Sequence, residues 1–371
     1  MEIVKTYTLN EIIDNPNVLK KVESRTDSGL LKIFFQTHII SYNIPNNITK
    51  LANCCFYRCY KLSSITIPDS VQSLGNCCFC NCSNLSSITL GSSVKSLGNC
   101  CFCNCSNLSS ITIPESVISL SNCCFCDCSN LNSITLGNLV TSLGEGCFYR
   151  CYKLRSITIP DSVQSLGNSC FYRCYELSSI TIPDSVTNLG NSCFSNCSKL
   201  GSITIPDSVT SLGNYCFSNC SNLSSISLGN SIKSLGNNCF QNCTNLTSIT
   251  IPDSVQRLNH YCFGDCSNIS SISLGSSVTS LGNCSNLSSI SLGSSVTSLG
   301  RYCFSGCSKL SSIIIPDSVT SLGNGCFRNC SNLTSITIPE NKLYLIDTTL
   351  EIPSECKIIT YKLKQPKKTF K

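Results

Sequence analysis

The chain has 371 residues, of which 41% are hydrophobic and 12% charged; Trp is absent and His occurs twice. This composition can bury a core, which excludes a disordered low-complexity chain, but it lacks the side-chain diversity of an ordinary enzyme. Six lysines and no acid lie in residues 357–371, leaving 20 basic against 20 acidic residues in the remaining chain. The net charge of +6 is therefore a property of the tail, and nucleic acid is disfavoured as a partner.

Residues 1–43 lack the repeat that organises the rest of the chain and are expected to form an N-terminal cap, with a short amphipathic helix over the first coil. Charged residues such as Glu2, Lys5 and Glu11 interrupt any apolar core that a secretory signal would need. No run of about 18 apolar residues is available to span a bilayer. We therefore expect a cytoplasmic location, with the cell surface, reached by an unconventional route, as the alternative.

A 23-residue period governs residues 44–338. Phe recurs at this spacing from Phe56 to Phe263 and again from Phe304 to Phe327. The 41-residue gap between the two series indicates that one coil, at residues 281–298, is five residues shorter. We count about thirteen units, too short to fold alone, which bury their apolar side chains by stacking on one another in a solenoid.

Each unit reads as two short extended segments joined by turns. Alternation of Ile65 and Ile67 predicts a strand with one buried face, Pro68 begins a turn, and residues 71–74 form a second extended segment. Residues 78–85 are expected to contain a helical turn or two. The prediction is a β-rich, right-handed repeat solenoid with a parallel sheet on one face and short helical turns opposite. Residues 339–371 are expected to form a C-terminal cap and a basic tail.

The unit LxxIxIPxSVxxLGxxCFxxCxx, as in Leu62 to Asn84, closely resembles the treponemal-type leucine-rich repeats of the BspA-like family, found in bacteria and expanded in mucosal protozoan parasites. The resemblance covers residues 44–338 and implies a leucine-rich-repeat coil of the α/β type. Family members are mostly described as surface or adhesion-related proteins. The resemblance therefore implies a binding function and brings no catalytic residue.

Most of the 33 cysteines occupy two positions of the repeat, one residue before the Phe and three residues after it, as Cys78 and Cys82 do around Phe79. Beside a buried aromatic ring, free cysteine acts as a small apolar side chain. Disulfides between equivalent cysteines on neighbouring coils, about 5 Å apart, are a first alternative. Zinc is a second, although the CFxxC register lacks the CxxC pairs of zinc sites. We predict no metal and no cofactor.

Seven further cysteines fall outside this register and lie on four consecutive units between Cys54 and Cys126. They are Cys54, Cys77, Cys80, Cys100, Cys103, Cys123 and Cys126. Stacking would gather them into one thiol-rich patch that could bind Zn or Cu(I) or oxidise in pairs. Duplication of one coil is the alternative explanation, and their redox state is left open.

Two surfaces are candidates for binding. The first is the hydroxyl ladder of the predicted strands, made of Ser64, Thr66, Ser87, Thr89, Ser110, Thr112, Ser133 and Thr135. The second breaks the repeat with tyrosine and basic side chains, the composition of interface hot spots. It comprises Tyr149, Arg150, Tyr152, Lys153, Tyr172, Arg173 and Tyr175, which are expected to cluster on neighbouring coils. The same motif recurs at Tyr57–Lys61, so duplication is again the alternative.

The sequence favours a non-enzymatic scaffold for protein–protein interaction, with an adhesion-related role implied by the resemblance. His38 and His260 are isolated, and the recurrent Asp of the turns repeats along one edge, so no acid, base and nucleophile converge. The expected partner is a protein, with weak contact between the lysine tail and an anionic membrane surface as a minor alternative. A thiol-rich metal-binding or redox-responsive protein is the alternative function.

Overall fold

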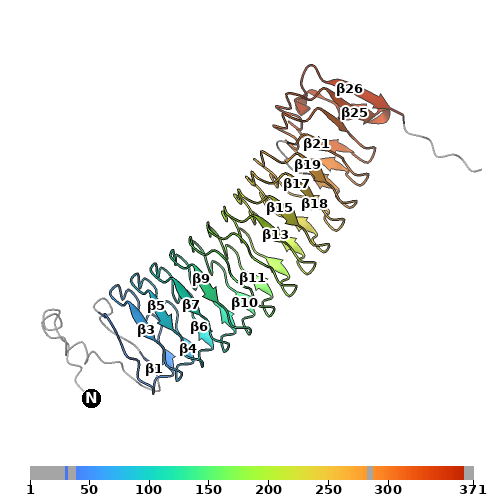
Figure 1. The fold of residues 1–371 in the computed structure, drawn as a ribbon. Helices are drawn as coiled ribbons and strands as arrows, with labels where there is room; N and C mark the ends of the chain where they lie inside the picture. The colour runs from blue at the N-terminus through green and yellow to red at the C-terminus, as the bar shows by residue number, and fades with distance from the viewer. Residues whose placement is uncertain (1–29, 32–38, 282–286, 363–371) are drawn as a thin grey trace, which may run out of the picture. The chain divides into compact units, whose positions relative to one another are not determined.

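The computed structural model describes residues 30–31, 39–281 and 287–362 (Figure 1). Two compact units, Met1–Ser162 and Val163–Lys371, divide the chain, and each is described by itself. Both are built from stacked coils of short parallel strands, which confirms the predicted β-solenoid. The helix expected in residues 1–29 lies outside the described residues, as does Cys284 of the short coil.

The first unit carries two parallel ladders. One pairs two-residue strands on successive coils, beginning with a strand at residues 30–31 of the expected N-terminal cap. Its members are β1 (Leu30–Leu31), β2 (Lys50–Leu51), β4 (Ser73–Leu74), β6 (Ser96–Leu97), β8 (Ser119–Leu120) and β10 (Ser142–Leu143). The other consists of β3 (Ser64–Thr66) with β5 (Ser87–Thr89) and of β7 (Ser110–Thr112) with β9 (Ser133–Thr135).

The second unit repeats this arrangement. Its two-residue strands are β11 (Ser165–Leu166), β12 (Asn188–Leu189), β14 (Ser211–Leu212), β16 (Ser234–Leu235), β18 (Arg257–Leu258), β20 (Ser280–Leu281), β22 (Ser298–Leu299) and β24 (Ser321–Leu322). The other strands are β13 (Ser202–Thr204), β15 (Ser225–Ser227), β17 (Ser248–Thr250), β19 (Ser271–Ser273), β21 (Ser289–Ile290), β23 (Ser312–Ile314), β25 (Ser335–Pro339) and β26 (Lys357–Tyr361). Across the short coil, Ser280 pairs with Ser298, so a loss of five residues leaves the ladder in register.

The predicted parallel sheet is present, and a second parallel ladder forms at the other extended segment. One detail of the predicted architecture is wrong. The expected helical turns are successive β-turns in the described coils: in one of them, the N–H of Cys80 donates to Cys77 O and the N–H of Cys82 to Phe79 O. A helix cannot propagate there because Cys77 and Asn81 have φ of 53° and 63°. The intervening N–H groups bond the next coil instead, as Phe79 N does to Cys101 O at 2.7 Å.

A column of phenylalanine rings runs through the core of each unit. Rings on successive coils lie 4.9–5.6 Å apart from Phe56 to Phe148, and 5.3–5.6 Å apart from Phe171 to Phe263. The described cysteines one residue before and three residues after each Phe are fully buried, which confirms their structural interpretation. In nine of these pairs the second cysteine also donates its thiol to a Phe carbonyl of the preceding coil, as Cys82 Sγ does to Phe56 O at 3.0 Å.

Asparagines that follow the two-residue strands join coils of the first unit. The side-chain oxygen of Asn53 accepts from the N–H of Asn76, and that of Asn76 accepts from the N–H of Asn99, both at 2.8 Å. Gly75 precedes this bond, and a Cβ at its position would lie 2.5 Å from the backbone nitrogen of Asn53. The close approach of the coils therefore favours glycine at this position.

The C-terminal segment of the second unit continues one ladder. Two short 3₁₀ helices, η2 (Glu340–Leu345) and η3 (Thr348–Leu350), follow β25, and β26 then pairs in parallel with β25. Leu350 is buried, and its carbonyl accepts the N–H of Phe327 at 3.0 Å, where another coil would otherwise bond. Residues 357–361, assigned from the sequence to a basic tail, thus include a strand.

Candidate functional site

The hydroxyl ladder lies where the sequence placed it. In β3, β5, β7 and β9 the Ser and Thr side chains are exposed while the intervening Ile is buried. Parallel pairing aligns Ser64 with Ser87 and Thr66 with Thr89. These small, regular side chains suit an exposed strand and identify no particular ligand.

The tyrosine-arginine cluster of the first unit is organised by stacking. The Arg150 guanidinium lies over the Tyr149 ring, 5.0 Å from its centroid, and Arg150 Nη1 lies 3.6 Å from Asp127 Oδ1. Tyr149, Arg150 and Tyr152 are half-buried, and Lys153 is exposed. A cation held over an aromatic face beside a carboxylate has little freedom to lose on binding.

The copy of this motif in the first coil adopts the same arrangement. Arg58 lies over the Tyr57 ring at 5.1 Å, and Tyr60 is 41% exposed. The stacked pair is thus a property of the motif and forms in a coil with different neighbours.

In the second unit, Arg173 lies over the Tyr172 ring at 5.3 Å, and Tyr175 is 38% exposed. The adjoining carboxylate of Glu176 pairs with Lys199 Nζ at 2.8 Å. Each of the two units therefore holds one predicted cluster. Their union into a single patch stays a prediction.

The arginines occupy backbone positions that do not suit arginine. Arg58, Arg150 and Arg173 have φ of 58–60°. Every other described coil has Asn, Asp or Gly at the equivalent position, the residues that tolerate left-handed backbone. The three exceptions are also the coils with tyrosine on both sides, so the substitutions occur together and carry a backbone cost of about 1 kcal/mol each.

Six of the seven additional cysteines form a feature that the sequence reasoning missed. Besides the CFxxC register, Cys77 and Cys80 form a CxxC pair, as do Cys100 with Cys103 and Cys123 with Cys126. The CxxC spacing is visible in the sequence, but it overlaps the CFxxC register that the Phe defines. The structure places each pair on one β-turn of the first unit.

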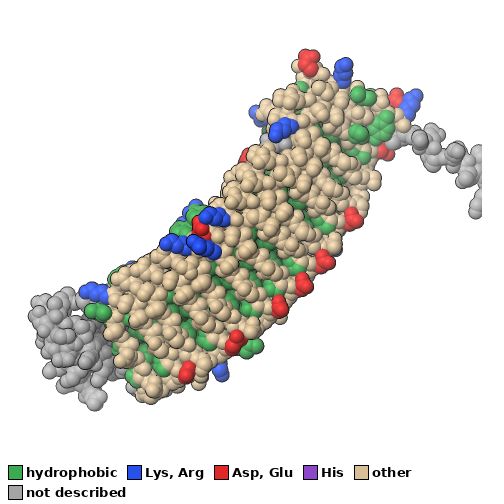
Figure 2. Space-filling view, viewed as in Figure 1, with side chains coloured by type: hydrophobic (Ala, Val, Ile, Leu, Met, Phe, Trp, Pro, Cys, Tyr) green, Lys and Arg blue, Asp and Glu red, His purple; other side chains and the backbone are tan. Residues whose placement is uncertain are grey.

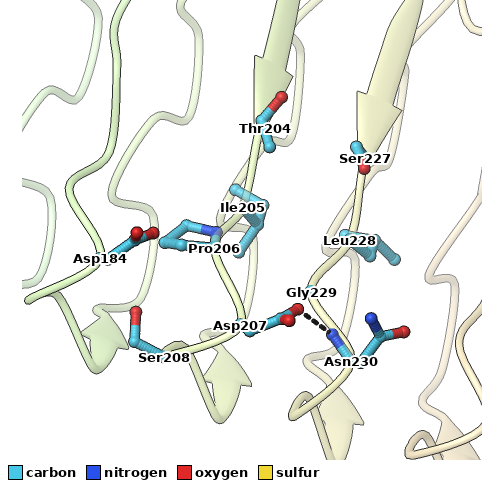
Figure 3. A pocket seen from close by; sticks show the side chains of 10 residues that line it. All are labelled: Asp184, Thr204, Ile205, Pro206, Asp207, Ser208, Ser227, Leu228, Gly229 and Asn230. Atoms are coloured by element: carbon cyan, nitrogen blue, oxygen red, sulfur yellow. Dashed lines mark hydrogen bonds between the residues drawn. The ribbon is translucent and has the colours of Figure 1, made fainter.

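An acidic edge is the remaining polar feature. On the face drawn in Figure 2, charged side chains are few and acidic ones recur along one edge of the coils. A hollow of about 440 Å³ lies at this edge in the second unit, between the corners at Pro206 and Gly229 (Figure 3). Asp207 Oδ1 there accepts the N–H of Asn230 at 2.7 Å. The carboxylate thus has a structural role, because its hydrogen bond joins two coils.

Asp69 acts in the same way in the first unit. The N–H and hydroxyl of Ser92 both donate to its carboxylate, which lowers its pKa. Within residues 30–31, 39–281 and 287–362, no group of three or more His, Cys, Asp or Glu side chains is placed to hold a metal ion. The same residues contain no helix with the length and apolarity needed to cross a bilayer.

Stacked parallel ladders around a phenylalanine column define a leucine-rich-repeat solenoid. The family model described as "BspA type Leucine rich repeat region (6 copies)" matches residues 31–151, 96–221, 188–285 and 280–369. The chain belongs to this family.

Solved structures of leucine-rich repeat proteins have a similar fold. A leucine-rich repeat protein from Bacteroides ovatus is 25% identical, with a TM-score of 0.57 over 90% of this chain and 94% of that one. The pneumococcal vaccine antigen PcpA is 17% identical, with a TM-score of 0.53 over 90% of this chain and 92% of that one, and shows the fold alone. Comparison with curated proteins gave no match.

Proposed function

We propose that the chain is a non-enzymatic scaffold that binds a protein partner through its tyrosine-arginine clusters. Leucine-rich repeats are in general protein-binding scaffolds, and the regularity of this one leaves only the breaks in the repeat to select a partner. The single observation that carries the proposal is the left-handed arginine stacked on tyrosine. Asparagine would suit that left-handed backbone better. Arginine nevertheless replaces it at position 150, and tyrosine replaces the usual residues at positions 149 and 152 of the same coil.

The cluster of the first unit has the physical properties of a binding anchor. The stacked ring and guanidinium present a large, pre-ordered surface, and truncation of such anchors typically costs about 2 kcal/mol or more each. Lys153 adds an exposed positive charge. A partner with a carboxylate-bearing, partly apolar surface fits this chemistry.

The test replaces the cluster with the sequence of another coil. Residues 218–222 read Ser-Asn-Cys-Ser-Asn, so Tyr149→Ser, Arg150→Asn, Tyr152→Ser and Lys153→Asn convert one natural coil into another. The matched control, Gln241→Ser with Thr244→Ser, makes the same conversion in a coil without tyrosine or arginine. Proteins captured by the wild type and the control but lost by the variant are the expected partners.

The equivalent change at Tyr172, Arg173 and Tyr175 tests the second unit separately. A folded cluster variant that captures the same proteins as the wild type, at the same affinity, contradicts the proposal and moves the binding surface to the hydroxyl ladder.

Adhesion is the finer form of this proposal and rests on the resemblance to surface proteins. Binding of the labelled chain to intact cells, compared with the cluster variant, tests it. The cytoplasmic location expected from the N-terminal sequence stays a prediction, which fractionation with an antibody to the untagged chain checks.

A further inference from the structure

Three consecutive turns of the first unit each carry two outward cysteines at CxxC spacing. The N–H of Cys80 donates to Cys77 O at 3.2 Å, and the corresponding bonds close the turns of the other two pairs at 3.1 Å. The end residues of a β-turn lie less than about 7 Å apart at Cα, and disulfides span about 4.4–6.8 Å. The backbone therefore already holds each pair at the distance that a disulfide needs.

Solvent reaches five of these six thiols but not the cysteines that stand between them. Five of the six are partly exposed, and Cys80 is 7% exposed. Cys78, which stands between the members of the first pair, is completely buried, and so are its equivalents in the other two turns. An oxidant of ordinary size can therefore meet the outward pairs and leave the interior cysteines untouched.

The thiols also interact with one another. Burial and the nearby thiols of Cys100 and Cys80 raise the pKa of Cys77 to about 11. The thiol of Cys126, through a hydrogen bond, is the main cause that raises the pKa of Cys103 to about 12. These sulfur atoms are therefore protonated at neutral pH, and because the thiolate is the attacking form, oxidation should become faster as the pH rises toward these values.

Packing does not explain these cysteines. Residues 192–195 in the second unit read Ser-Cys-Phe-Ser and form the same turn, with the N–H of Ser195 donating to Ser192 O at 3.1 Å. Serine thus suffices at both positions, including that of Ser195, which is 4% exposed. The six cysteines are an addition to a turn that folds without them.

We propose that the three turns, Cys77/Cys80, Cys100/Cys103 and Cys123/Cys126, are dithiol sites oxidised reversibly by a low-molecular-weight disulfide of the glutathione type. One thiolate attacks the glutathione disulfide and releases the first glutathione thiol. The second cysteine then attacks the mixed disulfide and releases the other. Two protein S–H bonds and one glutathione S–S bond are replaced by one protein S–S bond and two glutathione S–H bonds, so the electron pair passes to glutathione. This activity is independent of the protein-binding clusters.

The first experiment treats the native full chain with glutathione disulfide, then counts thiols after alkylation and unfolding. We expect six of the 33 thiols to be lost, with two hydrogen atoms lost per pair by intact mass and full recovery with dithiothreitol. Glutathione adducts at thiols outside the three turns, such as Cys54 or Cys356, add mass and are distinguished in this way. An intact mass that shows no loss of hydrogen overturns the proposal, and this measurement uses only the wild-type chain.

Two variants test the pairing in a Cys54→Ser background. One retains only Cys77 and Cys80 of the six, and the other retains only Cys77 and Cys100; the removed cysteines become serine. We expect two thiols to be lost in the first variant and none in the second. Equal loss in both, through a bond between coils, overturns the assignment to single turns. Continued protection of the interior cysteines checks that each variant is folded.

Discussion

Residues 77–82 of the first unit and residues 192–197 of the second build the same turn from different surface chemistry. Cys77 and Ser192 have φ of 53° and 55°, and Asn81 and Asn196 both have 63°. The inward cysteines and the phenylalanine are completely buried in both turns. The inward residues thus determine the backbone, and the outward ones can change from serine to cysteine, or to tyrosine and arginine, without altering it.

The largest expected effect concerns the inward cysteines that the two turns share. Burial raises the pKa of Cys216 and Cys266 to about 12, whereas an unfolded thiol has a pKa of about 8.5. Between these values the native state keeps protons that the unfolded state has lost, so the free energy of unfolding falls as pH rises. The fall is about 1.4 kcal/mol per pH unit for each thiol.

Fourteen inward cysteines have a raised pKa, so their summed loss over one pH unit above about 8.5 exceeds the 5–15 kcal/mol stability of a typical domain. We expect reversible unfolding between about pH 9 and 10 in reducing buffer, measured by circular dichroism. An intact β spectrum at pH 11 would contradict this expectation, because it would show that deprotonation of the unfolded thiols does not outweigh the stability of the fold.

Removal of an inward ring is the next largest change. Phe194 stacks on Phe171 and Phe217 at 5.3 Å on each side, so Phe194→Ala should lower the free energy of unfolding by about 3–5 kcal/mol in denaturant titrations. Tyr261→Ser is the matched control, because this ring is 46% exposed. Similar losses in both variants would contradict the separation of inward and outward positions.

Inward and outward cysteines should also differ on conversion to serine. Cys193→Ser places a hydroxyl in a fully buried site and should lower the free energy of unfolding by about 1–3 kcal/mol. Cys77→Ser should change it by no more than about 0.5 kcal/mol, since serine already serves in the equivalent turn. Equal effects in the two denaturant titrations would refute the distinction.

The smallest expected effect is a gain. Arg150→Asn replaces a left-handed arginine with the residue that other coils use and should raise the free energy of unfolding by about 1 kcal/mol. The lost stacking on Tyr149 and the lost ion pair with Asp127 offset part of this gain. A decrease of more than about 1 kcal/mol would mean that the arginine is retained for folding.

The 23-residue period was sufficient to predict the solenoid, both extended segments and the buried cysteines. Helical turns were predicted wrongly because the sequence does not show that left-handed residues recur at every fourth position of the turn segment, as at Cys77 and Asn81. The tyrosine and arginine residues were recognisable as breaks in the repeat, but the stacking of Arg150 on Tyr149 depends on that same backbone. The dithiol turns were missed because their spacing overlaps the structural CFxxC register.

Transplantation of the two cysteines into the second unit separates the backbone of the turn from the chemistry of its outward positions. Ser192→Cys with Ser195→Cys converts the turn of the second unit into the sequence Cys-Cys-Phe-Cys found in the first. This variant should lose two more thiols than the wild type on treatment with glutathione disulfide, while its free energy of unfolding changes by no more than about 0.5 kcal/mol. A folded variant that loses no additional thiols, or a variant that no longer folds, would contradict the claim that outward positions carry chemistry on a backbone set from within.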